Sequence, residues 1–423
     1  MKFARCTRTN RSTYRSVTRQ SWKNSAGTDR GSGWQLSWLS IVRVEQKPEA
    51  KATAGLTRVA SKSSGEADIG YTERPRRRPA SEMSEVALPR IPKQIATQPA
   101  SLFSNSDAQS RTDDVSQFLQ KRLGRLHAKL RLGIEADHEA QIFGQGINYF
   151  HIENLTLSHF VIRACLKLTG LYRRGRRNAA QVEVRHNYII SPQIPKAFDG
   201  YTILQLSDLH VDMSQDAMAR LTAIVKEMSY DLCVLTGDYR GQTFGSYQAT
   251  LADMSQICAE LKRPVYGVLG NHDTVCMLPG LEEMGIRMLL NEHKTIKRGH
   301  QHIYIAGIDD AHFFRADNIE KAASGIPSDE FSILLSHTPE IYRQAALADF
   351  NLLLSGHTHG GQICLPGRIP LTLGSVLPRH MGCGPWKYRN LIGYTSVGAG
   401  SSIVPVRFNC PPEITLHYLQ SSE

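Results

Sequence analysis

The pattern of hydrophobic and polar residues changes twice along the 423-residue chain. Residues 1–100 show neither a sustained helical nor a sustained strand period, and their polar, low-complexity text cannot bury a core. Apolar residues then recur at helical intervals, and after residue 182 short apolar runs alternate with helical patterns. We therefore expect a basic, mostly disordered extension over 1–110, a helical accessory region over 111–182 and a layered α/β domain over 183–423.

Two helical segments are predicted in the accessory region. In the first, the recurring apolar residues are Val115, Phe118, Leu119, Leu123, Leu126 and Leu130. The second, 153–177, is more apolar and ends in four arginines. Two interpretations stay open: the segments cap the domain that follows, or 153–177 rests on a membrane surface through its apolar face and basic end. The chain has no run of 18 apolar residues, so we expect no membrane-spanning helix.

The α/β domain is predicted from seven apolar runs that are typical of strands buried on both faces. These runs cover 182–190, 201–208, 231–238, 264–273, 302–310, 331–337 and 350–359. Helices fit between the runs, for example over 215–228 and 247–262. The alternation indicates an α/β fold in which helices flank layered sheets.

Five of the predicted strands end in residues of the kinds that bind metals. The candidates are Asp208, His210, Asp238, Asn271, His337, His357 and His359, with His272 and Asp273 following Asn271. The carboxyl ends of such strands meet at one edge of a sheet, so these side chains are expected to converge. Residues two apart in an extended segment point the same way, which lets both members of a D-x-H or H-x-H pair face one site. The glycines around His357 and His359 would let the backbone approach a metal and turn sharply.

The residue types indicate two-metal chemistry. Neutral imidazole and carboxylate suit Mn²⁺, Zn²⁺ or Fe, and a carboxylate can bridge two ions, which imidazole cannot do. Two ions about 3.5–4 Å apart can clamp a phosphate and activate a water as the nucleophile. Nothing indicates a serine or cysteine nucleophile, because the chain has no G-x-S-x-G motif and Cys276 has no evident partner.

These motifs carry a family resemblance. D-L-H at 208–210, G-D at 237–238, G-N-H-D at 270–273, His337 and G-H-T-H at 356–359 resemble, in order and separation, the signature of calcineurin-like metallophosphoesterases. The resemblance covers about residues 184–423 and extends to details of a bacterial phosphodiesterase branch. It implies an α/β calcineurin-like phosphoesterase fold, a sandwich of two mixed β-sheets flanked by helices, with 183–423 as the catalytic domain.

The resemblance also implies roles for individual residues. Asp208, His210 and His359 would hold one metal ion, and Asn271, His337 and His357 would hold a second. Asp238 would bridge the two ions. His272 would be no ligand: it would face the phosphate and either stabilise the developing charge or protonate the leaving oxygen.

The implied function is that of a phosphoester hydrolase that depends on two metal ions and uses a metal-activated water. Phosphodiesters are the expected substrate class. The metals would be two divalent ions of Mn, Zn or Fe. A pyrophosphohydrolase acting on a nucleotide-linked lipid A precursor is one alternative, and the apolar, arginine-ended segment 153–177 is the feature that favours it. A non-catalytic scaffold on the same fold is the other alternative, although such proteins usually lack some of the ligands.

Several neighbours of the motifs are open to two interpretations. Asp273 could orient a ligand histidine or be a solvated turn residue, and Arg240 could contact the substrate phosphate or lie at the rim. Asp309 and Asp310 end a strand, but other ligands already fill both metal sites. Arg407 is expected to be structural.

Charge and cysteine content change the picture only for the extension and the location. Residues 1–100 hold 19 Lys and Arg against 8 Asp and Glu, whereas the remaining residues hold 31 of each. The net charge of +11 therefore lies in the extension, and we expect no stable nucleic-acid partner, because a binding module carries its charge on the fold.

The acid-free first 28 residues are transit-peptide-like, with an extension upstream of the natural start as the alternative. Eight cysteines without a C-x-x-C pair fit a reducing compartment and predict a cytoplasmic protein, with peripheral contact at the inner membrane.

Overall fold

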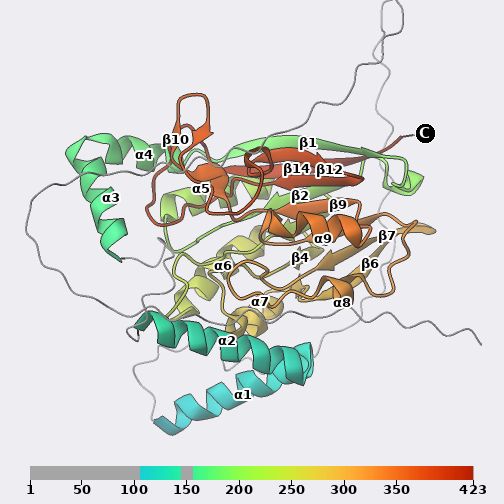
Figure 1. Ribbon diagram of the computed structural model, residues 1–423, viewed down its shortest axis with the longest axis horizontal. Helices are drawn as coiled ribbons and strands as arrows, with labels where there is room; N and C mark the ends of the chain where they lie inside the picture. The colour runs from blue at the N-terminus through green and yellow to red at the C-terminus, as the bar shows by residue number, and fades with distance from the viewer. Residues whose placement is uncertain (1–104, 144–155, 423) are drawn as a thin grey trace, which may run out of the picture. The chain divides into compact units, whose positions relative to one another are not determined.

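The computed structural model of the chain describes residues 105–143 and 156–422. Most of the predicted extension 1–110 therefore lies outside the described residues. The helices of the described part are α1 (Asn105–Leu123), α2 (Arg125–Phe143), α3 (Thr156–Leu168), α4 (Leu171–Ala179), α5 (Gln215–Glu227), α6 (Gln248–Glu260), α7 (Leu278–Glu283), α8 (Ile319–Ala323) and α9 (Tyr342–Leu347). Figure 1 shows how these helices lie around the strands.

The longer strands of the described part form two six-stranded mixed sheets. The first sheet has the order β1 (Glu183–Ser191), β14 (Glu413–Ser421), β2 (Thr202–Leu206), β3 (Leu232–Leu235), β4 (Val265–Gly267) and β5 (Ile286–Met288). The second has the order β12 (Gly384–Tyr388), β13 (Leu391–Thr395), β9 (Leu352–Ser355), β8 (Ser332–Leu335), β7 (Gln301–Gly307) and β6 (Glu292–Arg298). A small hairpin pairs β10 (Cys364–Leu365) with β11 (Ile369–Pro370).

The two sheets pack face to face around an apolar core. Side chains from β2, β3, β8 and β9, among them Ile203, Val234, Leu335 and Leu354, form one buried cluster between the sheets. A second cluster covers the outer face of the first sheet with α5, α6 and α7, and a third covers the outer face of the second sheet with α9. Strands buried on both faces explain the continuous apolar runs, and the predicted sandwich of two mixed sheets flanked by helices is confirmed.

Local sequence signals explain where the flanking helices begin. The Ser214 side chain accepts a hydrogen bond from the Ala217 amide and caps α5, and Asp216 lies in the first turn where the helix dipole favours an acid. Met218, Leu221 and Val225 of α5 are buried on the face toward the sheet. The predicted helices over 215–228 and 247–262 are confirmed, each within two residues.

The two predicted helical segments of the accessory region each contain a break. Gly124 and Gly170 have φ values of 89° and 71°, which end α1 and α3 and let the chain change direction. Because the direction changes at Gly124, the apolar pattern does not run on through α2: Leu119 and Leu123 are buried against the domain, but Leu126 is 82% exposed. Helix α1 also begins at Asn105, before the predicted boundary at 111, in a stretch without large apolar residues that could reveal it.

The segments α1–α2 and α3–α4 differ in how they meet the domain. Helix α1 packs its apolar side chains into the core cluster over the first sheet, as expected for a cap. Helix α4 is seated through Gly175, where a side chain would collide with Val406 and Phe408. Helix α3 exposes apolar residues, including Phe160 at 70% and Leu168 at 88%. Over the ranges that the structure describes, no helix is both long and apolar enough to cross a membrane.

Candidate metal centre

The predicted ligands come from the carboxyl ends of five strands in both sheets. Asp208 and His210 follow β2, Asp238 follows β3 and Asn271 follows β4 in the first sheet, and His337 and the pair His357 and His359 follow β8 and β9 in the second. All seven residues are buried, with exposed fractions of at most 8%. The sandwich therefore brings together at one end the residues that the sequence separates by up to 151 positions.

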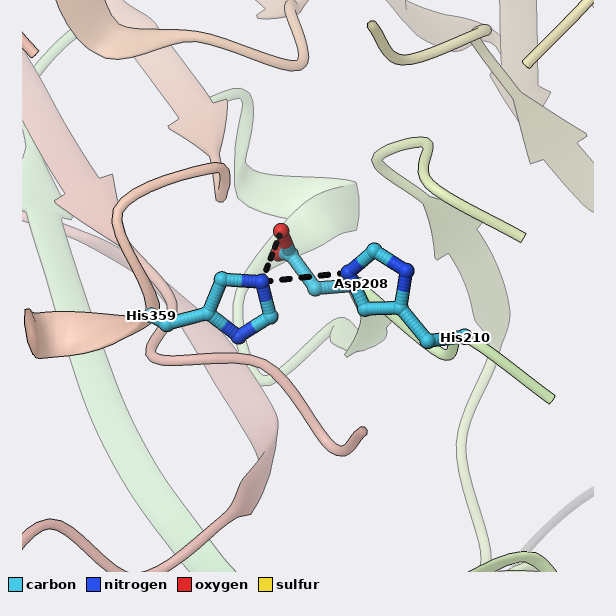
Figure 2. A group of neighbouring side chains, drawn as sticks. All are labelled: Asp208, His210 and His359. Atoms are coloured by element: carbon cyan, nitrogen blue, oxygen red, sulfur yellow. Dashed lines mark hydrogen bonds and ion pairs between the residues drawn. The ribbon is translucent and has the colours of Figure 1, made fainter. Parts of the chain in front are cut away.

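The first group consists of Asp208, His210 and His359, shown in Figure 2. The Nε2 atoms of His210 and His359 are 3.1 Å apart, and His359 Nε2 is 3.4 Å from Asp208 Oδ1. His210 Nδ1 lies 2.7 Å from the carbonyl oxygen of Arg240. Because a carbonyl can only accept, Nδ1 carries the proton and Nε2 presents its lone pair to the interior of the group.

The second group consists of Asn271, His337 and His357. The Asn271 Oδ1 atom is 2.9 Å from His337 Nε2 and 2.8 Å from His357 Nδ1. His337 Nδ1 is 2.8 Å from the carbonyl oxygen of Thr236, so this ring also turns its Nε2 inward. The backbone amide of His357 donates to both oxygens of Asp208, which ties the second group to the first.

Asp238 lies between the two groups. Its Oδ2 atom is 3.2 Å from His337 Nε2 and 3.7 Å from His210 Nε2. The same atom is 4.0 Å from His272 Nε2, and Asp238 Oδ1 accepts a hydrogen bond from the His272 amide. His272 thus stands over the junction of the two groups, with its Nδ1 3.2 Å from the Thr243 hydroxyl.

Burial sets the protonation of the first group. It lowers the pKa of His210 to about 4 and that of His359 well below its ordinary value, and it raises the pKa of Asp208 to about 6. Both imidazoles are therefore neutral at pH 7, the state in which imidazole binds metals.

The second group is protonated differently. Burial would lower the pKa of His337, but the adjoining Asp238 carboxylate outweighs burial and raises it to about 10. Burial would likewise raise the pKa of Asp238, but His337 and His272 hold it well below its usual range. His337 therefore carries a proton beside Asp238, at a place where a metal cation would compensate the same carboxylate.

The donor set fits two divalent cations. Asp208, His210 and His359 offer ligand atoms that all lie within 4.8 Å of one another, and so do Asp238, His337 and His357. Each group combines carboxylate with imidazole, and Asn271 adds an amide oxygen to the second. Carboxylate, amide and imidazole ligands suit Mn²⁺, Zn²⁺ and Fe, and the geometry of the side chains alone does not favour one of them.

Comparison with known proteins agrees with this geometry. Residues 201–361 match the family model described as calcineurin-like phosphoesterase. The uncharacterized metallophosphoesterase YkuE of Bacillus subtilis is 30% identical over 254 residues, which cover 57% of this chain and 86% of that protein. The chain belongs to the calcineurin-like phosphoesterase family.

Two further relatives widen the range of the family. A zebrafish transmembrane protein with a metallophosphoesterase domain is 30% identical over 280 residues, which cover 62% of this chain and 61% of that protein. The phosphodiesterase YaeI of Escherichia coli is 27% identical over 234 residues, which cover 51% of this chain and 81% of that protein. The chain thus spans less than two thirds of the zebrafish relative and most of the two bacterial ones.

Five of the candidate ligands have a strained backbone. Asp208, His210, Asp238, His357 and His359 have φ between 40° and 71°, in the left-handed region that residues with a side chain rarely adopt. Gly356 permits a close approach of the two loops that carry His357 and Asp208, because a side chain there would collide with Ser207 and Asp208. Glycine at this position thus allows the backbone before His357 to pack closely against Asp208.

Asp273 is placed differently from either interpretation given above, and Arg240 differently from one of them. Asp273 is fully buried, and its carboxylate accepts hydrogen bonds from the amides of Asp238, Tyr239 and Gly270. It therefore orients the loop backbone, and it is neither a solvated turn residue nor a partner of a ligand histidine. Arg240 is 3% exposed and donates to the carbonyl oxygens of His272, Thr243 and Gly245, so the prediction that it lies at the rim is wrong.

Arg407 is structural, and it adjoins the metal centre. It is fully buried, donates to the carbonyl oxygens of Val397 and Gly400, and has Nη2 3.2 Å from His359 Nδ1. Asp309 and Asp310 join neither ligand group, as expected. Asp309 pairs with His127 and Arg131 of α2.

Sequence patterns alone missed Ser207, Thr243 and Arg131. Ser207 donates to Asp208 Oδ2 at 2.5 Å, and a hydroxyl next to a ligand in sequence is the only signal that could have revealed it. Thr243 meets His272 across 29 positions, and Arg131 belongs to a helix that the pattern assigns to a separate region. A cavity of about 290 Å³ lies beside Thr243 and is also lined by Arg240, Phe314 and by Glu135 and Glu139 of α2.

Proposed function

We propose that this protein hydrolyses phosphoesters, phosphodiesters above all, at a dinuclear metal centre held by Asp208, His210, Asp238, Asn271, His337, His357 and His359. The observation that carries the proposal is the position of Asp238, whose Oδ2 lies within 3.7 Å of an imidazole nitrogen in each group. Two divalent ions supply charge neutralisation for the phosphate and activation of water at neutral pH.

The side chains of the protein would have two further roles, which are to hold the ions and to supply a proton to the leaving oxygen. The buried carboxylates and imidazoles would hold the ions, and His337 would give up its proton to the solvent when a metal cation takes its place beside Asp238. His272 has its Nε2 over the junction and its Nδ1 against Thr243, and it would hold the proton that the leaving oxygen takes up. No side chain needs to form a covalent bond with the substrate.

The test compares hydrolysis of bis-p-nitrophenyl phosphate and p-nitrophenyl phosphate by the protein loaded with Mn²⁺. We expect turnover of the diester and a loss of at least about 1,000-fold in the Asp238→Asn variant, since both groups depend on this carboxylate. Asp231→Asn is the matched control: this aspartate lies before β3 rather than after it and accepts from the Thr202 amide. Bound metal without turnover of either ester would favour a non-catalytic scaffold.

A substrate carried by a lipid is a narrower candidate that one observation favours. The surface of α3 and α4 exposes Phe160, Val161, Leu168 and Leu171 together with Arg163, Lys167, Arg173, Arg174, Arg176 and Arg177. Helices α3 and α4 contain no acidic residue. Apolar side chains beside exposed cations suit the surface of an anionic membrane. A pyrophosphate of a nucleotide-linked lipid A precursor is one substrate that such a surface would serve.

Vesicle binding tests this membrane contact. The protein should sediment with vesicles that contain phosphatidylglycerol and remain in solution with vesicles of phosphatidylcholine alone. Replacing both Phe160 and Leu168 by Ser should abolish sedimentation while turnover of the soluble diester is unchanged. Equal binding to both kinds of vesicle, or binding that survives the double substitution, would contradict the proposed contact.

A further inference from the structure

Helix α2 reaches the phosphoesterase site through one buried guanidinium. Arg131 has no exposed surface, although the neighbouring Leu130 is 50% exposed. Its Nη2 donates to the carbonyl oxygen of Asp273 at 3.0 Å, and its Nε donates to Asp309 Oδ1 at 3.3 Å. Asp273 follows His272 in the loop after β4, and Asp309 lies in the loop after β7. One side chain of the accessory region thus joins two loops of the catalytic domain.

The first of these loops carries His272. The Asp273 carboxylate holds the amides of Asp238 and Gly270, so its backbone is fixed to the bridging aspartate. Glu135, one helical turn after Arg131 and 2.7 Å from it, accepts hydrogen bonds from the Thr274 hydroxyl and the Val275 amide. Helix α2 therefore holds the three residues that follow His272.

The second loop carries His312, whose ring centroid is 4.3 Å from that of the ligand His357. Asp309 is fully buried and also contacts His127 of α2 at 2.8 Å. The next residue, Asp310, accepts hydrogen bonds from the amides of Phe313 and Phe314 and so shapes the turn. The Phe314 ring lies 3.4 Å from the Arg131 guanidinium carbon.

Attachment of the helices to the domain does not require this buried charge. Leu119, Leu123 and Ala128 already join the core cluster over the first sheet. A buried ion pair is often no more stabilising than apolar residues of similar size, and its best attested use is to select one arrangement. The geometry points to such a use of Arg131, because its partners belong to two loops that border the metal ligands.

We propose that Arg131 is a positioning residue of the phosphoesterase site, fixing the His272 loop and the His312 loop relative to each other. The proposal rests on the proposed hydrolytic function. It makes α2 a part of the active site and no longer an accessory helix. It also explains why α2 supplies Glu135 and Glu139 to the wall of the cavity beside Thr243.

Arg122 of α1 offers a matched control. It too joins a helix of the accessory region to the domain, through Glu282 at 2.8 Å, Glu292 at 2.7 Å and the carbonyl oxygen of Met288. Its partners lie around α7, β5 and β6, and none belongs to the two loops at the centre. Loss of Arg122 therefore removes a comparable attachment without touching His272 or His312.

The experiment compares the full chain with its Arg131→Met and Arg122→Met variants. Steady-state hydrolysis of bis-p-nitrophenyl phosphate with Mn²⁺ gives kcat and KM, and hydrogen exchange by mass spectrometry follows the amides of 270–276 and 309–316. We expect Arg131→Met to lower kcat by about 10- to 100-fold with KM within about threefold, because a misplaced proton donor affects the chemical step. Both loops should exchange faster in this variant, and Arg122→Met should change neither loop nor kcat.

A double variant separates positioning from stability. Arg131→Met leaves Asp309 buried without its guanidinium partner, whereas Arg131→Met with Asp309→Asn removes both charges. We expect the double variant to regain the unfolding temperature of Arg122→Met while kcat stays low. Recovery of wild-type kcat in the double variant, or unchanged exchange of both loops in Arg131→Met, would overturn the proposal. A wild-type protein without turnover would refute the hydrolytic function instead, and loop exchange would still decide the role of Arg131.

Discussion

The two groups of the candidate metal centre each contain two buried histidines, but the pKa of His337 in the second group is shifted in the opposite direction from those of His210 and His359 in the first. In the group of Asp208, His210 and His359, burial keeps both imidazoles neutral and raises the pKa of the carboxyl to about 6. In the group of Asn271, His337 and His357, the Asp238 carboxylate outweighs burial and raises the pKa of His337 to about 10. The difference teaches that burial alone does not set the charge of a histidine at the end of a strand, because a carboxylate at 3.2 Å outweighs burial at His337.

The largest expected effect concerns the metals themselves. Dialysis against a chelator should reduce diester hydrolysis by at least about 1,000-fold, and Mn²⁺ should restore it. We expect two bound Mn²⁺ per chain in the wild type and one in Asp208→Asn, since Asp208 belongs to one group only. Metal content by mass spectrometry, measured beside activity, checks both statements. Two bound ions in Asp208→Asn would erase the distinction between the halves.

The next effect concerns the stability of the metal-free protein. His337→Gln leaves the buried Asp238 carboxylate without its closest cation and should lower the free energy of unfolding by about 3–5 kcal/mol. His359→Gln removes a neutral ring and should change it by only about 1 kcal/mol. Urea unfolding in the presence of a chelator measures both variants. Equal losses would mean that the two halves carry the same charge after all.

A buried histidine outside the centre sharpens the comparison through pH. His417 has no exposed surface, its Nε2 lies 3.0 Å from Gln205 Oε1, and burial lowers its pKa to about 3. Below pH 6.5 the unfolded chain binds a proton here that the folded chain does not, so stability falls as the pH drops from about 6.5 toward 3. Between pH 7 and 5 this group should cost about 2 kcal/mol.

His417→Gln provides the measurement for that statement. Urea unfolding of the metal-free wild type and variant at pH 7 and pH 5 should show a smaller loss in the variant by this amount. An identical loss in both proteins would mean that His417 takes up a proton as readily in the folded chain as in the unfolded chain.

The smallest effect separates two serines that precede ligands in the two halves. Ser207 donates to Asp208 Oδ2, whereas Ser336 donates to the carbonyl oxygen of Thr338 and touches no ligand of the centre. Ser207→Ala should weaken Mn²⁺ binding by about tenfold, because a partner that orients a ligand is lost. Ser336→Ala should leave the affinity unchanged. Titration calorimetry compares the two, and equal affinities would make the Ser207 hydrogen bond irrelevant to the metal.

The sequence predicted the sandwich and the convergence of the ligands because both depend on short-range patterns. Continuous apolar runs identify strands buried on both faces, and β2, β3 and β9 end where the ligands begin. Strands without such runs were missed, among them β6 with the alternating text EHKTIKR and β14 at the C-terminus. Periodicity also mistook Leu126 for part of a buried stripe, since it cannot detect the turn at Gly124.

The support around the centre could not be predicted, because it depends on contacts between distant segments. In the sequence Arg131 is a polar residue between two leucines. Only the folded chain brings it into contact with Asp309, 178 positions away. For Asp273 and Arg240 the sequence left a surface position open, because charged residues after a strand are usually solvated. In this protein the side chains of both residues hydrogen-bond to the backbone of the loops that carry the candidate ligands.

The left-handed backbone at five candidate ligands lowers the conformational stability of the folded protein. At each of these positions glycine would relieve roughly 1 kcal/mol of conformational strain, but it would delete an imidazole or a carboxylate. Because all five side chains are buried, glycine would also leave a cavity in each place, and at Asp238 it would leave His337 without its carboxylate partner. The strain at these positions is therefore a cost of the candidate metal centre that no single substitution by glycine removes, and any effort to stabilise the protein has to act elsewhere and be checked for bound metal in every round.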